Sequence, residues 1–332
     1  MPFQPINTLR FLASWFQPIS TALFHPTLPW TIRWRLLLLQ PLNFLVYTIK
    51  CLPYAFSNTY ESMYIPTRDD GRRLRIIVFR PKKQDHDSKL RPLHLDFHAG
   101  GFIGGIPEVD APFCEMLCER TGAVVVSASY RLAPRHSFPA AHEDAEDVLS
   151  WLEVHAQDTL LADFYRLTVS GFSAGGNLMY MAGSRAKAAV GFYAPVDFRR
   201  APWEKPHPPS MPKNDPMKVF LPLMDVYAGG DVRKRAADDE RLHPILRRID
   251  ELPANLLHVV PGIDVIVEEQ MAFVERVRED FEWEGKGRRA EVKFFKEVFH
   301  GWLELPKGIV DEKFRTEAFE AAVAFIRRAQ EM

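Results

Sequence analysis

From residue 63 onward, short apolar runs alternate with stretches in which apolar residues recur every three or four positions. The runs predict buried strands at residues 74–80, 93–98, 124–129, 167–170, 190–193, 256–260 and 292–295. The periodic stretches predict amphipathic helices at residues 110–120, 141–155, 268–280 and 312–329. Because strands and helices alternate, we expect an α/β fold, with a mostly parallel central sheet and helices on both of its faces.

Residues 1–60 follow a different pattern, being rich in large apolar residues and poor in charge. These residues include Phe11, Trp15, Phe16, Phe24, Trp30 and Trp34. The most apolar part, residues 36–49, holds 14 uncharged residues, fewer than the roughly 18 to 20 of a membrane-spanning helix. We therefore expect no membrane span. The favoured interpretation is a helical cap that lines an apolar pocket. A second, compatible interpretation is a segment resting on lipid, with headgroup contacts from Arg33, Arg35 and Lys50.

Residues 199–253 interrupt the alternation of strands and helices. They are rich in proline and charge, with a short helical pattern near residues 217–227. We interpret them as an insertion above the sheet. The predicted organisation is a cap segment at 1–60, a catalytic α/β domain in two parts at 61–198 and 254–332, and a cap insertion at 199–253.

Composition and charge narrow the classes of function. The chain of 332 residues is 47% hydrophobic and 26% charged, which is enough apolar material for a large core. Its formal net charge of −1 gives no electrostatic reason to expect a nucleic-acid partner. The three cysteines cannot form a disulfide framework, and neither a glycosylation sequon nor a secretory signal pattern is present. We expect an intracellular, cytoplasmic protein, with peripheral membrane association left open.

One predicted strand ends in a sequence that must turn sharply into a helix. Gly171-Phe172-Ser173-Ala174-Gly175 has the pattern Gly-x-Ser-x-Gly and separates the run at 167–170 from a helix-like stretch at 174–186. Such a turn exposes the serine hydroxyl above a sheet and needs glycine where chain segments approach closely. The alternative is a glycine-rich loop with an ordinary serine. The context favours Ser173 as a nucleophile for acyl transfer.

A serine nucleophile needs an imidazole to take its proton and a carboxylate to orient that imidazole. Asp264 follows the strand at 256–260, and His300 lies in the loop after the run at 292–295. This is the chain order Ser, Asp, His that the strand-turn-helix motif requires. Taken alone, Asp264 could cap a helix and His300 could be a turn residue. Glu268 and Glu269 compete as the acid, but they sit inside the following helix, so we expect them to support the fold or face solvent.

The oxyanion of the reaction needs several N–H donors directed at one point. Ala174 offers one, and the glycine-rich sequence 98–102 follows the apolar run at 93–97, where Gly100 and Gly101 allow close approach to a carbonyl. His98 is expected to be structural. A phosphate-binding loop is the alternative, but its lysine and its glycine spacing are missing.

These motifs together resemble the hormone-sensitive-lipase-type branch of the α/β-hydrolases, a group of carboxylesterases. The resemblance rests on residues 98–102, 130–134, 138–141 and 171–176 and runs from about residue 63 to 330. It implies an α/β-hydrolase fold with an N-terminal cap and no cofactor. It also implies a triad and oxyanion donors at Ser173, Asp264, His300, Gly100, Gly101 and Ala174. This chain departs from the family pattern at Ala99, Phe172, Arg135 and Val265, which makes transfer of substrate identity unsafe.

We therefore expect a serine hydrolase that cleaves a small to medium apolar ester or lactone through an acyl-enzyme. No metal motif accompanies the triad, so neither a metal nor a cofactor is expected. Substrate-pocket side chains are expected from Phe102, Phe172 and Trp302. One alternative is acyl transfer, cyclisation or elimination on a specialised metabolite. A second alternative is a small-molecule receptor, which the presence of His300 disfavours, because related plant gibberellin receptors lack that histidine.

Overall fold

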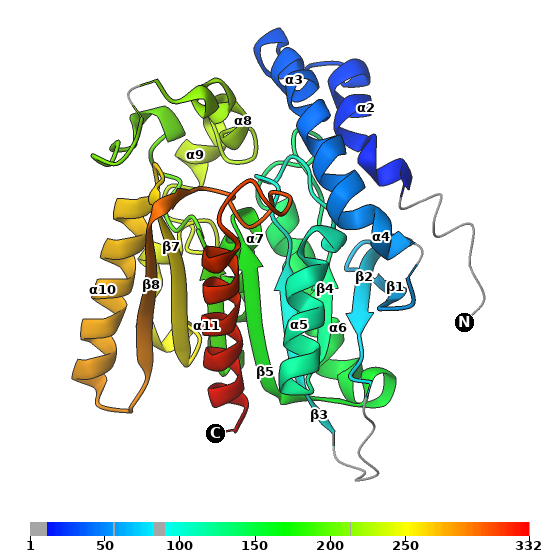
Figure 1. Cartoon of the computed structure of the whole chain (residues 1–332), viewed down its shortest axis with the longest axis vertical. Helices are drawn as coiled ribbons and strands as arrows, with labels where there is room; N and C mark the ends of the chain where they lie inside the picture. Colours follow the sequence, from blue (N-terminus) through cyan, green and yellow to red (C-terminus); the bar gives the residue numbers. More distant parts are fainter. Residues whose placement is uncertain (1–11, 56, 83–89, 213, 332) are drawn as a thin grey trace.

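The computed structural model describes residues 12–55, 57–82, 90–212 and 214–331. The first eleven residues of the predicted cap segment, including Phe11, lie outside this description. The central element is an eight-stranded sheet of order β1-β2-β4-β3-β5-β6-β7-β8 (Figure 1). Strands β3 to β8 run parallel, whereas β2 pairs antiparallel with β1 and β4. The expected α/β fold with a mostly parallel sheet is confirmed.

Each predicted run overlaps a strand, and the sheet has one further strand at its edge. The bounds of the strands are β1 (Glu61–Pro66), β2 (Arg73–Phe79), β3 (Arg91–Phe97), β4 (Val124–Ala128), β5 (Ala162–Phe172), β6 (Ala188–Phe192), β7 (Asn255–Ile263) and β8 (Arg289–Phe299). Strand β1 was not predicted, because four of its six residues are only half-buried and so form no apolar run.

Helices cover both faces of the sheet. Helices α5 (Ala111–Thr121) and α11 (Glu312–Glu331) pack on one face, against the alternate side chains of β2, β6 and β7. Helices α6 (Ala140–His155), α7 (Ala174–Leu178) and α10 (Val267–Glu284) pack on the other. Successive strand residues point to opposite faces of the sheet. Ile77 therefore packs in the core under α5 and α11, and Ile76 packs in the core under α6, α7 and α10.

The described part of the N-terminal segment is mostly helical and lies beside the sheet, and two of its helices carry most of its length (Figure 1). They are α2 (Gln17–Phe24) and α3 (Trp30–Val46), and α3 continues through a π-helical turn, η1 (Tyr47–Cys51), into α4 (Leu52–Ala55). Pro41 does not end α3, although it interrupts the apolar run. The continuous helix Trp30–Tyr54 is long and apolar enough to cross a membrane by length and composition, and 28% of its most apolar window is buried. It is therefore longer than the apolar run suggested.

The insertion at 199–253 is irregular and lies above the edge of the sheet at which α7 begins (Figure 1). Among its described residues it contains α8 (Leu221–Met224), α9 (Asp231–Arg235) and several 3-10 turns. The N-terminal helices reach the same edge. Two segments far apart in the sequence thus flank the carboxyl ends of the parallel strands, where α/β proteins place their sites. The predicted domain boundaries themselves stay a prediction.

Candidate active site

Ser173 occupies a strained turn between β5 and α7. Its φ of 49° and ψ of −114° lie in a region that residues other than glycine seldom adopt. A Cβ atom on Gly171 would lie 2.1 Å from the carbonyl oxygen of Gly175, and one on Gly175 would lie 1.9 Å from the carbonyl oxygen of Phe97. Both positions therefore require glycine. The amide of Ser173 donates to the Phe192 carbonyl at 2.9 Å, which holds the turn against β6.

The structure brings the three predicted triad side chains together. His300 Nε2 lies 2.8 Å from Ser173 Oγ, and His300 Nδ1 lies 2.8 Å from Asp264 Oδ2. The second carboxylate oxygen of Asp264 accepts a bond from the Ile266 amide at 3.1 Å. Asp264 is only 2% exposed, so its charge acts on the imidazole with little solvent screening. This arrangement can move a proton from the serine to a histidine of defined orientation.

Burial and three charged groups set the proton affinity of His300. Burial lowers its pKa, and so does the cation of Lys205, but the charge and hydrogen bond of Asp264 and the charge of Glu304 outweigh them and leave the pKa raised. Glu304 is held in place by the Tyr193 hydroxyl, which donates to it at 2.6 Å. The Tyr193 ring also lies 5.0 Å from the imidazole, between centroids.

The two glutamates that compete with Asp264 have other positions. Glu269 pairs with Lys205 at 2.5 Å and accepts a bond from the Val196 amide at 3.2 Å, so it ties the insertion to the segment after β6. Glu268 is exposed on α10. Their geometry agrees with the expected supporting and solvated roles.

The glycine-rich loop after β3 lies against the start of α7. Strands β3 and β5 are paired so that Phe97 faces Gly171 in the register, which brings the two strand ends together. Gly100 has a φ of 139°, and a Cβ atom there would lie 2.1 Å from the Gly104 carbonyl oxygen. Gly101 has a φ of 59°. The loop is thus placed beside Ala174, as three oxyanion donors at Gly100, Gly101 and Ala174 require.

His98 has the structural position that we expected. It is buried, its Nδ1 lies 2.7 Å from the Ala99 carbonyl, and its ring stacks on Tyr130 at 4.3 Å. The Tyr130 hydroxyl also donates to the His98 carbonyl. These contacts fix the first turn of the loop.

The three expected pocket residues are buried in packing contacts, and their part in a substrate pocket stays a prediction. Phe102 stacks on Tyr227 at 4.0 Å, and Phe172 stacks on Phe192 at 4.1 Å. Trp302 is fully buried and contacts Tyr193. Phe172 belongs to the core that α5 and α11 share with the sheet, since it ends a strand whose alternate residues point there. Proximity to a motif in sequence did not reveal these directions.

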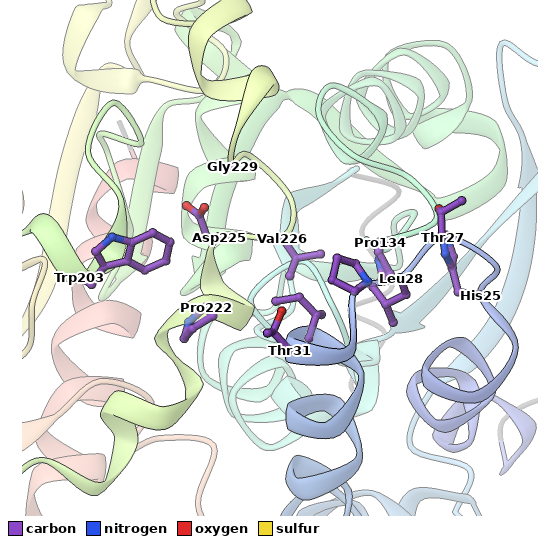
Figure 2. Close-up of a pocket in the computed structure, with 12 residues that line it drawn as sticks. His25, Thr27, Leu28, Thr31, Pro134, Trp203, Pro222, Asp225, Val226 and Gly229 are labelled. Carbon is purple, nitrogen blue, oxygen red and sulfur yellow. The ribbon is translucent and has the colours of Figure 1, made fainter.

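A cavity of about 480 Å³ lies between the N-terminal segment and the insertion (Figure 2). Residues 25–32 form one wall, and residues of the insertion form the other. The lining includes Leu28, Ile32, Pro134, Trp203, Asp225 and Val226. Met224, which precedes the lining residue Asp225 in the chain, has its sulfur 3.1 Å from the position of a Cβ atom added on Gly101 of the oxyanion loop.

Two N-terminal residues that carry no recognisable motif hold the loops of the site. The Tyr47 hydroxyl accepts a bond from the Gly105 amide at 3.2 Å, at the end of the glycine-rich loop. Lys50 Nζ donates to the Leu303 carbonyl at 3.0 Å, three residues after His300. Lys50 is the single charged residue in 36–60, and a lone cation in an apolar segment is the signal that could have identified it. Among the described residues, no group of three metal-ligating side chains is assembled.

Comparison with known proteins places this geometry in a family. The model of the alpha/beta hydrolase fold family matches residues 94–304, which contain the whole triad. The chain is 37% identical to Probable carboxylesterase 8 of Arabidopsis thaliana over 136 residues, 37% of this chain and 40% of that protein. It is 29% identical to hormone-sensitive lipase of Ictidomys tridecemlineatus over 207 residues, 58% of this chain and 26% of that protein. The matches thus span less than half of these relatives.

Solved structures give the same result over more of the chain. The carboxylesterase EstE1, cloned from a metagenomic library, superposes with a TM-score of 0.69 at 26% identity. The superposition covers 86% of this chain and 95% of EstE1. The similarity therefore includes nearly all of a solved carboxylesterase.

Proposed function

We propose, for a chain that belongs to the α/β-hydrolase fold family, that it is a carboxylesterase acting on apolar esters or lactones through an acyl-enzyme. The observation that carries the proposal is the hydrogen-bonded sequence Ser173–His300–Asp264, with 2.8 Å at both steps. The relatives named above are described as carboxylesterases or as a lipase, which favours hydrolysis over acyl transfer, cyclisation or elimination.

In the first half of the reaction, Ser173 Oγ attacks the carbonyl carbon of the ester while His300 Nε2 takes the hydroxyl proton. The carbonyl oxygen becomes an oxyanion and accepts hydrogen bonds from the amides of Gly100, Gly101 and Ala174. Asp264 stabilises the imidazolium and keeps Nε2 directed at the serine. The intermediate collapses, His300 protonates the leaving alcohol, and an acyl-Ser173 ester remains.

In the second half, water replaces the alcohol. His300 removes a proton from the water as its oxygen attacks the acyl carbonyl, and the same amides hold the second oxyanion. Collapse of this intermediate breaks the bond to Ser173 Oγ, which recovers its proton from His300, and the carboxylic acid leaves. No step requires a group beyond this chain, the substrate and water.

The cavity supports an apolar substrate of more than minimal size. Its walls contain Leu28, Ile32 and Val226, and Met224, next to the lining residue Asp225, contacts the oxyanion loop at Gly101. Pockets that bind small organic molecules are of this size and are lined mainly by apolar groups. We assign this cavity to the bulky apolar part of the substrate.

Ser173→Ala tests the proposal directly. We expect loss of ester turnover and of covalent labelling by a fluorophosphonate probe, because the labelled oxygen is gone. Ser184→Ala, at an exposed serine, is the matched control and should label normally. Labelling or turnover that persists in Ser173→Ala would show that the nucleophile is another residue.

A further inference from the structure

One face of helix α3 and of the η1 turn that continues it carries large apolar side chains that point to solvent. Leu38, Leu42, Leu45 and Ile49 are between 37% and 51% exposed. The spacing of Leu38, Leu42 and Leu45 puts them in one line on a helix of 3.6 residues per turn, and Ile49 follows four residues later in the η1 turn. We call these four residues the α3 stripe. A soluble surface helix normally places polar groups on this face.

The opposite face of α3 is already occupied by the protein. Leu36, Gln40 and Tyr47 are buried there. Arg35 donates to the Val219 carbonyl at 2.7 Å, and Lys50 donates to the Leu303 carbonyl. The helix is therefore docked on the catalytic domain along one side while its apolar stripe remains open on the other.

The exposed apolar surface continues beyond the stripe. Phe16, Leu23, Phe24 and Trp30 are also exposed, so residues 16–49 contribute eight of the nineteen exposed large apolar side chains in the described part of the chain. Arg33 joins the two helices by donating to the carbonyls of Leu23 and His25 at 2.9 Å. Exposed apolar surface is thus concentrated on the α2–α3 pair, and such a concentration marks an interaction surface.

Charge distinguishes the partners that this surface fits. Residues 1–60 contain no Asp or Glu, and their four Lys or Arg residues are Arg10, Arg33, Arg35 and Lys50. Arg35 and Lys50 donate to the catalytic domain, whereas Arg33 lies between α2 and α3, and no carboxylate of this segment would repel the phosphate of a lipid headgroup. Trp30 and Trp34 lie at one end of the helix, and tryptophan is enriched at the headgroup level of membranes.

We propose that the α2–α3 pair rests on the surface of a lipid bilayer, with the α3 stripe inserted at the boundary between headgroups and acyl chains. The helix lies in the plane of the membrane, because its other face is held by the catalytic domain. This orientation also puts the cavity wall at residues 25–32 next to the lipid, so that apolar esters dissolved there have a short path to the site. The docking itself does not depend on the proposed hydrolysis.

Vesicle flotation of the full chain tests the proposal. Vesicles of phosphatidylcholine, with and without phosphatidylserine, should carry the protein, more so with the anionic lipid and at low salt. Replacing the stripe by L38S/L42S/L45S/I49S should lower the partition coefficient by on the order of 100-fold or more, because four apolar side chains no longer enter the lipid. The control L161S/Y165S/W283S changes three apolar residues that are exposed elsewhere, and it should float like the parent protein.

Folding of each variant is checked by hydrolysis of a water-soluble ester and by circular dichroism, which does not depend on activity. The stripe touches no reacting group, so both readouts should be unchanged. If the fourfold variant fails to fold, L38E provides the same test with one charge on an exposed position. Flotation that survives a folded stripe variant would overturn the proposal. So would a parent protein that stays unbound and instead forms a dimer that the stripe variant abolishes.

Discussion

Asp264 is the residue at which the proposed mechanism can be separated from its nearest competitors. Asp264→Asn keeps the shape of the side chain but favours the wrong histidine tautomer, so kcat should fall by about 10⁴. Glu268→Gln, at an exposed position one helical turn away, should have little effect. Steady-state kinetics on a soluble ester measures both. If Glu268→Gln proves the more damaging change, the acid has been assigned to the wrong residue.

The pH dependence of kcat/KM reports the proton affinity of His300. The imidazole must be neutral to accept the serine proton, so activity should rise with pH through its pKa. Burial and Lys205 lower that pKa, but Asp264 and Glu304 raise it by more than this decrease. The midpoint should therefore lie above the ordinary value of 6.5. Glu304→Gln removes one negative charge and should move the midpoint down. A midpoint that is unchanged in Glu304→Gln would exclude its electrostatic role.

A second buried carboxylate lies inside the sheet, away from the reacting groups. Asp96 accepts bonds from Ser170 at 2.6 Å and from Ser127 at 3.0 Å. Burial nevertheless raises its pKa from 3.8 to about 6. The folded protein therefore binds this proton more tightly than the unfolded chain does. The resulting stability is fully present below pH 3.8 and is lost as the pH rises to about 6.

Asp96→Asn should remove this pH dependence. Between pH 4 and 6 the unfolding free energy of the parent should fall relative to the variant by about 3 kcal/mol at most, the equivalent of two pKa units. Denaturant unfolding at several pH values measures it, with Asp250→Asn at an exposed site as the control. Parallel pH profiles for parent and Asp96→Asn would contradict the raised pKa.

At the level of residues, the sequence indicates the order of candidate groups along the chain but not the direction in which a side chain points. Ser173, Asp264 and His300 were identified because each follows a recognisable strand. The direction of Phe172 was not evident, because the last residue of a strand can face either side of the sheet and here joins the core below. The sequence does not indicate the role of Tyr193, because its hydroxyl bonds to Glu304, which is 111 residues away along the chain.

At the level of elements, the π-helical turn η1 connects the N-terminal segment to both loops of the site. Tyr47 accepts from Gly105 and Lys50 donates to Leu303. Burial lowers the pKa of Lys50, although Glu304 opposes this effect. One helical turn thus contacts the oxyanion loop and the histidine loop, so the N-terminal segment supports the active site as well as flanking it.

Lys50→Met should test this support. It keeps an unbranched side chain only one atom shorter but removes the bond to the Leu303 carbonyl, so the His300 loop should shift from its position. Small misplacements of catalytic groups reduce rates by up to about 100-fold. We expect kcat to fall by about tenfold or more with KM changed less, while Lys218→Met, an exposed control, retains full activity. Equal kcat values for the two variants would show that the contact does not position the loop.

Helices and strands could be predicted wherever burial of one face leaves a periodic pattern of apolar residues in the sequence. Helices α6 and α11 begin and end within two residues of the predicted bounds, because each has an apolar face and a polar face. Strand β5 is longer than the predicted run at 167–170, since its first residues are largely half-buried or exposed and carry polar side chains. The insertion stayed undefined in sequence, because its short 3-10 turns have no periodicity that spans more than one turn.

At the level of the whole molecule, the cavity is formed by two segments that neither motif nor periodicity connects. Residues 25–32 and the insertion meet only above the sheet, and Leu28, Ile32 and Val226 line the space between them. Under the proposed assignment of the cavity, substrate selection lies in segments that are separate from the triad. Changes there should alter which ester is cleaved without altering how it is cleaved.

The double substitution L28A/I32A tests this separation. Removing two large apolar groups should lower kcat/KM for a bulky apolar ester by about 10-fold to 100-fold, because weaker hydrophobic binding of the substrate costs about 1 to 3 kcal/mol. An acetate ester does not reach the cavity, so its kcat/KM should change little, and fluorophosphonate labelling of Ser173 should persist. V154A, at an exposed position on α6, is the control. Equal decreases for both esters would mean that these residues support the fold of the site and do not form its pocket. A decrease confined to the bulky ester would place substrate selection at the junction of the two segments.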